Sequence, residues 1–137
     1  MSAYFSPLEI TYELTSPTAK EPVRATDGSA GFDVFADLDN RPVKIFRHGG
    51  HNPIVVEPLP TPLRHSRIML APGERAQIPL GIKIEVPIGW KVDVLPRSGR
   101  AINDALTLIN SPGLGDADYP EEYYALVINH NWQDVPI

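Results

Sequence analysis

The sequence has 137 residues, a net charge of −5 at pH 7 and 42% hydrophobic residues. A chain of this length forms one domain that buries roughly 65–70% of the surface its unfolded form exposes. Its apolar runs, such as Ile54–Val56, are too short to span a bilayer, and a net negative charge disfavours sequence-independent binding to nucleic acid, which requires a basic surface. We therefore expect neither a membrane nor a nucleic-acid partner, while a small, discrete anion stays compatible with the charge.

The N-terminus and the cysteine content bear on the compartment. The first residues, MSAYFSPLEITYEL, lack a basic region followed by an apolar one, and the chain has no cysteine for a disulfide framework. We expect a cytoplasmic, or more generally intracellular, protein.

Proline and glycine set the fold class. Fifteen prolines and ten glycines interrupt the chain too often for long helices, because proline removes an amide donor and clashes with the preceding helical turn. The pattern predicts an all-β fold, a jelly roll or distorted barrel, with one short helical segment at Ser98–Leu106. The predicted strands are Leu8–Leu14, Gly31–Ala36, Ile54–Val56, Arg75–Pro79, Ile82–Val86, Lys91–Leu95, Thr107–Ile109 and Tyr123–Asn129.

Residues 37–67 differ in charge from the rest of the chain. Five Lys or Arg against three acidic residues give this range +2, and the other 7 basic and 14 acidic residues leave −7 elsewhere. We interpret 1–137 as a single domain with a loop or hairpin insertion at 37–67. The insertion is expected to be a solvated loop, a docking surface for an acidic protein partner, or a lid over an anionic ligand. His48 and His51 within it do not predict a zinc site, because two glycines separate them and no further ligand type lies nearby.

Two turns on either side of a short predicted strand carry residues suited to nucleotide chemistry. In Pro96–Gly99, a guanidinium, a hydroxyl and backbone amides can converge on a phosphate. In Asp116-Ala117-Asp118, which follows Gly113-Leu114-Gly115, we expect a turn in which one carboxylate faces a cleft and the other bonds local amides. A purely structural Asx-turn is the alternative for that second turn.

Three motifs, in this order, resemble those of the trimeric dUTP pyrophosphatases, or dUTPases. The first motif of that family ends in Ala-Gly-x-Asp, matched by Ala30–Asp33, and the second, Pro-Arg-Ser-Gly-x-Ala, is matched by Pro96–Ala101. The third is an Asn followed by Gly-x-x-Asp-x-Asp-Tyr. It is matched by Asn110, Gly113, Asp116, Asp118 and Tyr119.

The resemblance implies a jelly-roll protomer that assembles as a homotrimer with its active sites between subunits. It also implies hydrolysis of dUTP to dUMP and pyrophosphate, which limits uracil in DNA and supplies dUMP for dTTP synthesis. Asp116 would be the catalytic general base that activates water for attack on the α-phosphorus.

The family's other roles transfer to matching positions of this chain. Tyr119 would pack on the deoxyribose and exclude a 2′-hydroxyl, and Asn110, with Gly113 beside it, would read uracil. The phosphates would be held by Arg97, Ser98 and Gly99. Asp33 would contact a Mg²⁺ cofactor through water while the metal bridges the triphosphate.

The chain departs from the family pattern at several positions. Arg100 and Gly115 stand where the family has apolar residues, and Pro120-Glu121 replaces the usual Arg-Gly after Tyr119. The sequence ends at Ile137, about where a fourth motif would begin. We expect a shortened sequence, a site that works without a C-terminal tail of its own, or a protein with reduced turnover.

Two other functions are compatible with the same fold. One is a dUTP-binding regulatory protein with weak or no hydrolysis. The other is a dCTP deaminase-like enzyme, in which a catalytic Glu lies three residues before the Asn of the following strand. Here Leu126 occupies that position relative to Asn129, which disfavours deamination.

Overall fold

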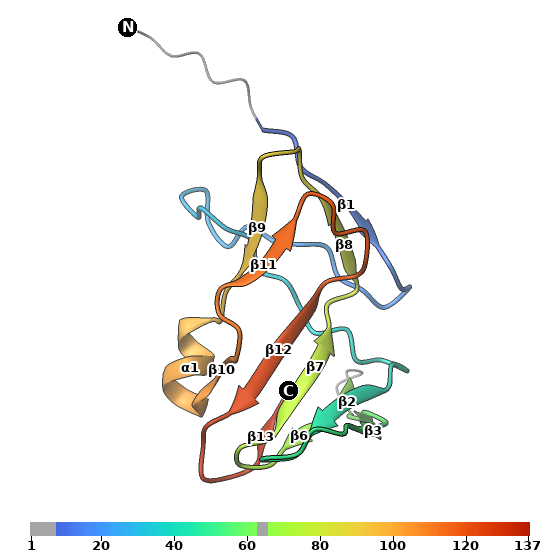
Figure 1. Ribbon diagram of the computed structural model, residues 1–137, viewed down its shortest axis with the longest axis vertical. Helices are drawn as coiled ribbons and strands as arrows, with labels where there is room; N and C mark the ends of the chain where they lie inside the picture. The colour runs from blue at the N-terminus through green and yellow to red at the C-terminus, as the bar shows by residue number, and fades with distance from the viewer. Residues whose placement is uncertain (1–7, 63–65) are drawn as a thin grey trace, which may run out of the picture.

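The structure of the chain, a computed structural model, describes residues 8–62 and 66–137 (Figure 1). The predicted all-β fold with one short helix is confirmed. The elements in chain order are β1 (Thr11–Leu14), β2 (Val43–Phe46), β3 (Ile54–Val56), β4 (Leu59–Pro60), β5 (Ser66–Arg67), β6 (Met69–Leu70), β7 (Arg75–Pro79), β8 (Ile82–Glu85), β9 (Lys91–Val94), α1 (Ser98–Asp104), β10 (Leu106–Leu108), β11 (Gly113–Asp116), β12 (Tyr124–Asn129) and β13 (Val135–Pro136).

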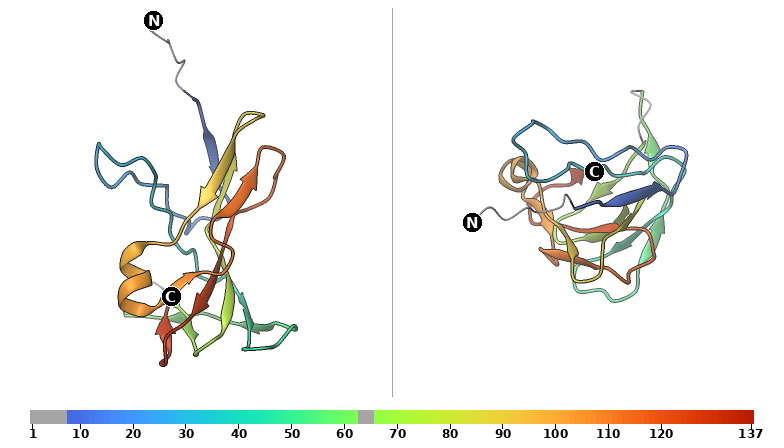
Figure 2. Two further views of the ribbon diagram at one scale, coloured as in Figure 1. Left: turned by 60° about the vertical axis from the view of Figure 1, so that its left-hand side comes forward. Right: turned by 90° about the horizontal axis from the view of Figure 1, so that it is seen from above.

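The centre of the molecule is an antiparallel five-stranded sheet in the order β10-β12-β7-β2-β3. Four two-stranded pairs surround it: β1 with β8, β9 with β11, β6 with β13, and β4 with β5. The β9–β11 pair continues from the central sheet toward the end of the molecule where β1 and β8 lie (Figures 1 and 2). No closed barrel is formed by the strands within the described residues.

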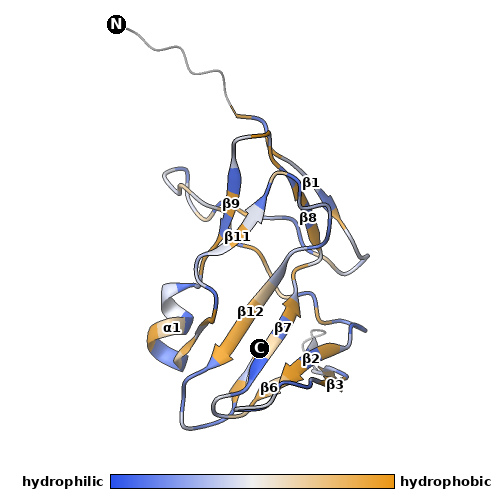
Figure 3. Cartoon of the chain, viewed as in Figure 1, coloured by the Kyte–Doolittle hydropathy of each residue, from blue (hydrophilic) through white to orange (hydrophobic). Residues whose placement is uncertain are grey.

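The main core lies against the central sheet. Its strands alternate as expected for a half-buried sheet: Val43 and Ile45 of β2 are buried while Lys44 between them is exposed. β2 and β12 are drawn mostly in the apolar colour in Figure 3. The buried residues of the main core are Leu38, Val43, Ile45, Ile68, Leu70, Ala76, Ile78, Leu106, Leu108, Val127 and Val135. A second, smaller cluster of Leu80, Ile82 and Tyr123 packs near β8.

Most predicted strands are confirmed, with ends shifted by up to three residues. Arg75–Pro79 and Ile54–Val56 match their predicted bounds. The strand predicted at Gly31–Ala36 is wrong, because this segment forms only one isolated bridge, between Asp33 and Val23. The helical segment predicted to Leu106 ends at Asp104, where Ala105 takes a left-handed conformation that terminates α1.

The range 37–67 holds the β2–β3 hairpin, and β2 pairs with β7 inside the central sheet. Arg64 lies outside the described residues. That this range is inserted relative to the family stays a prediction.

Arg100, one of the departures from the family motif, has a structural role. It pairs with Asp104 at 2.7 Å along the helix and also donates to the Pro136 carbonyl of β13. The arginine thus ties α1 to the last strand.

Candidate functional site

The third motif lies on β11 and the turn after it. β11 pairs antiparallel with β9, so that Gly113 is opposite Val94 and Asp116 is opposite Lys91. The turn expected at Asp116-Ala117-Asp118 is present, but Asp116 is also the last residue of a strand, and Ala117 and Asp118 form the body of the turn. The two glycines weaken strand propensity locally, but pairing with β9 supplies the missing hydrogen bonds.

Three of the residues expected to bind substrate line one cavity of about 220 Å³. Asn110, Gly113 and Tyr119 reach it from β11 and its flanking loops, while β7 and β12 form its other walls. The complete lining is Gln77, Val94, Asn110, Gly113, Leu114, Tyr119, Tyr123, Tyr124 and Leu126. The motif pattern contained no signal for Gln77, which comes from the distant strand β7, or for Tyr123 and Tyr124, which follow the third motif at the start of β12.

The Tyr119 ring is held from two sides. Its hydroxyl donates to the Glu122 carbonyl at 3.1 Å, and its ring meets Tyr123 edge-on with 5.3 Å between ring centroids. Its backbone N–H donates to the Asp116 carbonyl at 3.1 Å, which closes the turn. Tyr119 and Asp116 are therefore joined by one short, hydrogen-bonded turn.

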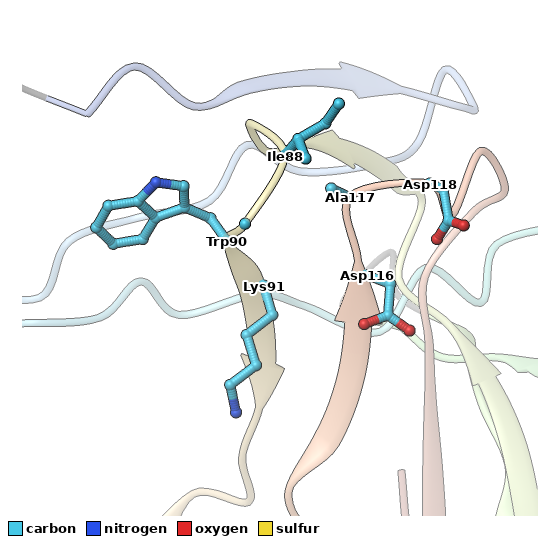
Figure 4. A pocket seen from close by; sticks show the side chains of 7 residues that line it. Ile88, Trp90, Lys91, Asp116, Ala117 and Asp118 are labelled. Carbon is cyan, nitrogen blue, oxygen red and sulfur yellow. The ribbon is translucent and has the colours of Figure 1, made fainter.

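Asp116 faces a second, more open hollow of about 650 Å³ (Figure 4). Lys91 and Asp118 line it beside Asp116, and Ile88 and Trp90 come from the loop between β8 and β9. The Trp90 indole points away from the two carboxylates (Figure 4). Lys91 donates to Asp93 at 2.7 Å, and Asp116 is exposed to solvent.

The first and second motifs meet at a separate place. The Arg97 guanidinium lies 3.8 Å from the Asp33 carboxylate, and the Arg97 side chain is 70% exposed. Ser98 and Gly99 begin α1 next to it, and no atom lies within 4 Å of the position that a Cβ on Gly99 would occupy. This leaves the backbone of Pro96–Gly99 open to a ligand.

The structure thus brings the predicted residues together in two groups. Asn110, Gly113 and Tyr119 share the smaller cavity, and Gly113 begins the strand that ends in Asp116, which lines the larger hollow. Asp33 meets Arg97 beside Ser98 and Gly99. No hydrogen bond or ion pair among the described residues joins the two groups. The same part of the chain contains no cluster of three or more His, Asp or Glu side chains placed to hold a metal ion.

Tyr123 fills the space left by Gly115, the residue before Asp116. Its ring and hydroxyl lie less than 3.0 Å from the position that a Cβ of Gly115 would occupy. The buried hydroxyl has no hydrogen-bond partner within the described residues. Burial raises the pKa of Tyr123, and the nearby Tyr119 and Asp116 raise it further.

A buried ion-pair network lies next to the same loop. Arg41 pairs with Glu122 at 2.6 Å and with Asp37 at 2.8 Å. The hydrogen bond from Arg41 to Glu122 contributes most to raising the pKa of the guanidinium. Burial by itself would raise the pKa of Asp37, but hydrogen bonds from Ser16, Arg41 and Thr18 outweigh it and lower that pKa.

Comparison with known proteins gives one family. The chain is 32% identical over 116 residues to the deoxyuridine 5′-triphosphate nucleotidohydrolase of Caldanaerobacter subterraneus, covering 85% of this chain and 61% of that protein. It is 33% identical over 119 residues to the enzyme of the same name from Anaeromyxobacter, covering 87% and 62%. A shorter match to the Chlamydia pneumoniae protein of that name reaches 50% identity over 62 residues, 45% of this chain and 43% of that one. The chain spans about 61% of the length of the first two relatives.

Solved structures show the same fold. The dUTPase of the Staphylococcus aureus phage phi11, in a mutant form, superposes with a TM-score of 0.65 at 20% identity, covering 90% of this chain and 61% of that one. The dUTPase of Staphylococcus bacteriophage 80alpha superposes with a TM-score of 0.63 at 22% identity, covering 90% and 60%.

No protein-family model matches the chain. Within the described residues, no helix has the length and apolar character needed to cross a membrane. With its three motifs in order, its mostly β fold and these relatives, the chain belongs to the dUTPase family.

Proposed function

We propose that the protein hydrolyses dUTP to dUMP and pyrophosphate. The observation that carries the proposal is the cavity that Asn110, Gly113 and Tyr119 share next to β11, the strand that ends in Asp116. A cavity of about 220 Å³ suits a nucleobase and its sugar rather than a whole triphosphate, so the phosphates would extend past the end of β11 toward Asp116.

In this mechanism Asp116 accepts a proton from water while the water oxygen bonds to the α-phosphorus. The bond from the α-phosphorus to the oxygen that bridges it to the β-phosphorus breaks, and pyrophosphate leaves. The exposed carboxylate at the end of a paired strand has a fixed backbone position and open access to water, as a general base requires. Asn110 offers an amide donor and acceptor for uracil, and the Tyr119 ring would cover the deoxyribose.

Arg97 and its neighbours are the proposed phosphate ligands. Arg97 is exposed, and its single carboxylate neighbour lies at a loose 3.8 Å, so the guanidinium can turn to a phosphate without breaking a strong pair. Because the Arg97 group is not in contact with the third-motif residues, we propose that each active site combines Arg97, Ser98 and Gly99 of one subunit with Asn110 and Asp116 of another.

We propose a homotrimer, both because the two groups of site residues are separate on one chain and because of its exposed apolar side chains. Large apolar side chains stand exposed on the single chain, as they would on surfaces that become buried between subunits. Those with the highest exposure are Ile88 at 97%, Trp132 at 94%, Ile102 at 82%, Val55 at 66% and Leu95 at 64%.

Mg²⁺ fits the site as a cofactor that enters with the substrate. Mg²⁺ binds through one or two carboxylates, several waters and substrate phosphates rather than through a closed protein cage. The half-buried Asp33 beside Arg97 provides one such carboxylate, and the absence of a three-ligand cluster among residues 8–62 and 66–137 agrees with this mode. When bound, the ion would offset the charge of the triphosphate; the phi11 relative is described with a structural Mg(II) ion.

The proposal is tested by incubating the protein with dUTP, dCTP, dTTP and UTP in Mg²⁺ and measuring pyrophosphate release. We expect release from dUTP alone. Comparable rates on all four nucleotides would contradict the proposal, as would no release from dUTP by the full-length native protein. Binding of dUTP without release would indicate the regulatory function instead, and ammonia released from dCTP would indicate a deaminase.

A further inference from the structure

Arg41 joins two carboxylates next to the loop that carries the third motif. Its Nη1 and Nη2 donate to the two Glu122 oxygens at 2.8 and 2.6 Å, and Nη1 also donates to Asp37 at 2.8 Å. The side chains of Arg41, Asp37 and Glu122 are 22%, 2% and 13% exposed. A two-pronged guanidinium–carboxylate pair so shielded from water holds both partners in one orientation.

Glu122 is also fixed through its neighbours. Its Oε1 accepts a hydrogen bond from the Gly81 N–H at 2.9 Å. The next residue, Tyr123, donates to the Ile82 carbonyl at 2.9 Å, and its own carbonyl accepts from Leu80 at 3.1 Å. The backbone at Glu122 therefore has one position relative to the chain between β7 and β8.

The Glu122 carbonyl accepts the hydrogen bond from the Tyr119 hydroxyl at 3.1 Å. Tyr119 is 41% exposed and lines the smaller cavity. Together with its edge-on contact with Tyr123, this hydrogen bond orients the phenol ring. The placement of the ring therefore depends on the placement of the Glu122 carbonyl, and Arg41 holds the side chain of that same residue.

We propose that Arg41 is a positioning residue that sets selectivity for deoxyribose over ribose. It acts through Glu122 on Tyr119, and the inference rests on the proposed function, in which the Tyr119 ring leaves no room for a 2′-hydroxyl. If the contact between Arg41 and Glu122 is lost, the Tyr119 ring can move away from the sugar. The kcat/KM for UTP should then rise relative to that for dUTP. Arg41 lies 81 residues from Glu122 in sequence, and no motif of the family names it.

The chain offers a matched control in Arg75. This arginine is also half-buried, donates to the Gly50 carbonyl at 2.6 Å and lies over the Phe46 ring at 5.6 Å. It lines neither cavity. Replacing Arg75, which lies on β7, removes the contacts of another half-buried arginine without touching Glu122.

The experiment measures kcat/KM for dUTP and for UTP, together with binding of dUpNHpp, the analogue with an imido bridge after the α-phosphorus. The proteins compared are the unaltered chain, Arg41→Met, Arg41→Lys and Arg75→Met. We expect the dUTP-to-UTP ratio to fall by about tenfold in Arg41→Met, because small misplacements of a positioning group cost this much or more. In Arg41→Lys the ratio should fall less, since a lysine keeps the positive charge but cannot bind both carboxylate oxygens as a guanidinium does. In Arg75→Met the ratio should stay within about twofold of that of the unaltered protein.

A double variant tests whether Arg41 acts through Tyr119. Tyr119→Phe keeps the ring and removes the hydroxyl, so it should also lower the ratio. The ratio of the double variant Arg41→Met with Tyr119→Phe should then be no lower than that of Tyr119→Phe alone, because both changes break the same connection from Arg41 through Glu122 to the Tyr119 hydroxyl. Additive losses would show that Arg41 does not act through this hydrogen bond and would overturn the inference.

The remaining outcomes are equally decisive. An unchanged ratio in folded Arg41→Met, or an equal fall in Arg75→Met, refutes the role of Arg41 while dUTP hydrolysis by the unaltered protein leaves the proposed function standing. If the unaltered protein neither binds dUpNHpp nor hydrolyses dUTP, both are wrong. Should Arg41→Met fail to fold because two carboxylates lose their partner, Arg41→Lys and Glu122→Gln are judged by the same ratio.

Discussion

The buried ring of Tyr123 occupies the space where a Cβ of Gly115 would lie. The family has an aliphatic side chain directly before its catalytic Asp, and this chain has glycine there with a tyrosine from the start of the next strand filling the gap. Because Gly115 precedes Asp116 on β11, the fit between these two residues sets the position of the proposed base.

Gly115→Ala should destabilise the protein and lower its activity. The added methyl would meet the Tyr123 ring at less than 3.0 Å, and overpacking of this kind costs about 1–3 kcal/mol. Thermal melting and dUTP turnover measure the two effects. Adding Tyr123→Leu to Gly115→Ala should restore part of the lost stability and turnover, because the shorter side chain leaves room for the methyl. A double variant that is no more stable or active than Gly115→Ala alone would contradict the proposed packing of Tyr123 against Gly115.

The stability of the protein should fall in acid partly through Asp37. Its pKa is lowered in the folded state, mainly by the hydrogen bonds from Ser16, Arg41 and Thr18 that outweigh burial. A depressed pKa contributes stability that is fully present above the unfolded value of about 3.9 and is lost as pH falls through the lower folded value. Urea unfolding of the unaltered protein and of Asp37→Asn at a series of pH values measures this contribution. The difference in the free energy of unfolding between the two proteins should be constant near neutral pH and become smaller below about pH 4. A difference that does not change with pH down to acid unfolding would contradict the role given to Asp37.

Asn129 should be essential to the core rather than to the chemistry. Its side chain is fully buried, donates to the carbonyls of Leu70 and Gln133, each at 2.8 Å, and accepts from the Asn131 N–H at 2.7 Å. Asn129→Leu leaves these groups without partners, and each costs about 1–3 kcal/mol. Denaturant unfolding should show a loss in that range or above, whereas Asn52→Leu in the exposed loop between β2 and β3 should change little.

Arg97→Met should weaken substrate binding without weakening the fold. The side chain is 70% exposed and its neighbour Asp33 lies 3.8 Å away, so the pair contributes between about 0 and 1 kcal/mol to stability. Loss of a charged phosphate ligand should raise KM for dUTP by about tenfold or more, since charge-assisted hydrogen bonds are roughly twice as strong as neutral ones. The exposed Arg67→Met in β5 is the control for loss of one positive charge. A KM that is equal in both variants would argue against Arg97 as a phosphate ligand.

The sequence allowed much of the sheet to be predicted, because turn residues and alternating apolar residues are local signals. Arg75–Pro79 matches its prediction for this reason. β2 was not predicted, since the positive charge of 37–67 suggested an excursion from the core. Lys44 faces outward while Val43 and Ile45 are buried, so charge composition concealed a core strand. A deletion of 38–66 would therefore remove part of the core.

Some residues of the candidate site could also be predicted from local sequence patterns, and others could not. The third motif named Asn110, Gly113 and Tyr119, and the structure places these three residues around the smaller cavity. Arg41 and Glu122 could not be found from sequence, because their contact joins segments 81 residues apart. The contact of Tyr123 with Gly115 depends on how the chain folds back after β11, which no local pattern shows. The strand at Gly113–Asp116 was missed because its pairing with β9 is a tertiary effect that overrides the low strand propensity of glycine.

The central claim is that Asp116 is the base for dUTP hydrolysis, and one measurement tests it most directly. Pyrophosphate release from dUTP in Mg²⁺ is compared between the unaltered protein, Asp116→Asn, and Asp134→Asn, which removes an exposed carboxylate from the loop before β13. dUpNHpp binding confirms that each variant retains its site. We predict a loss of about 10²-fold or more in Asp116→Asn alone, the contribution expected of a general base. Turnover by Asp116→Asn within a few-fold of the unaltered protein, with dUpNHpp still bound, would contradict the account.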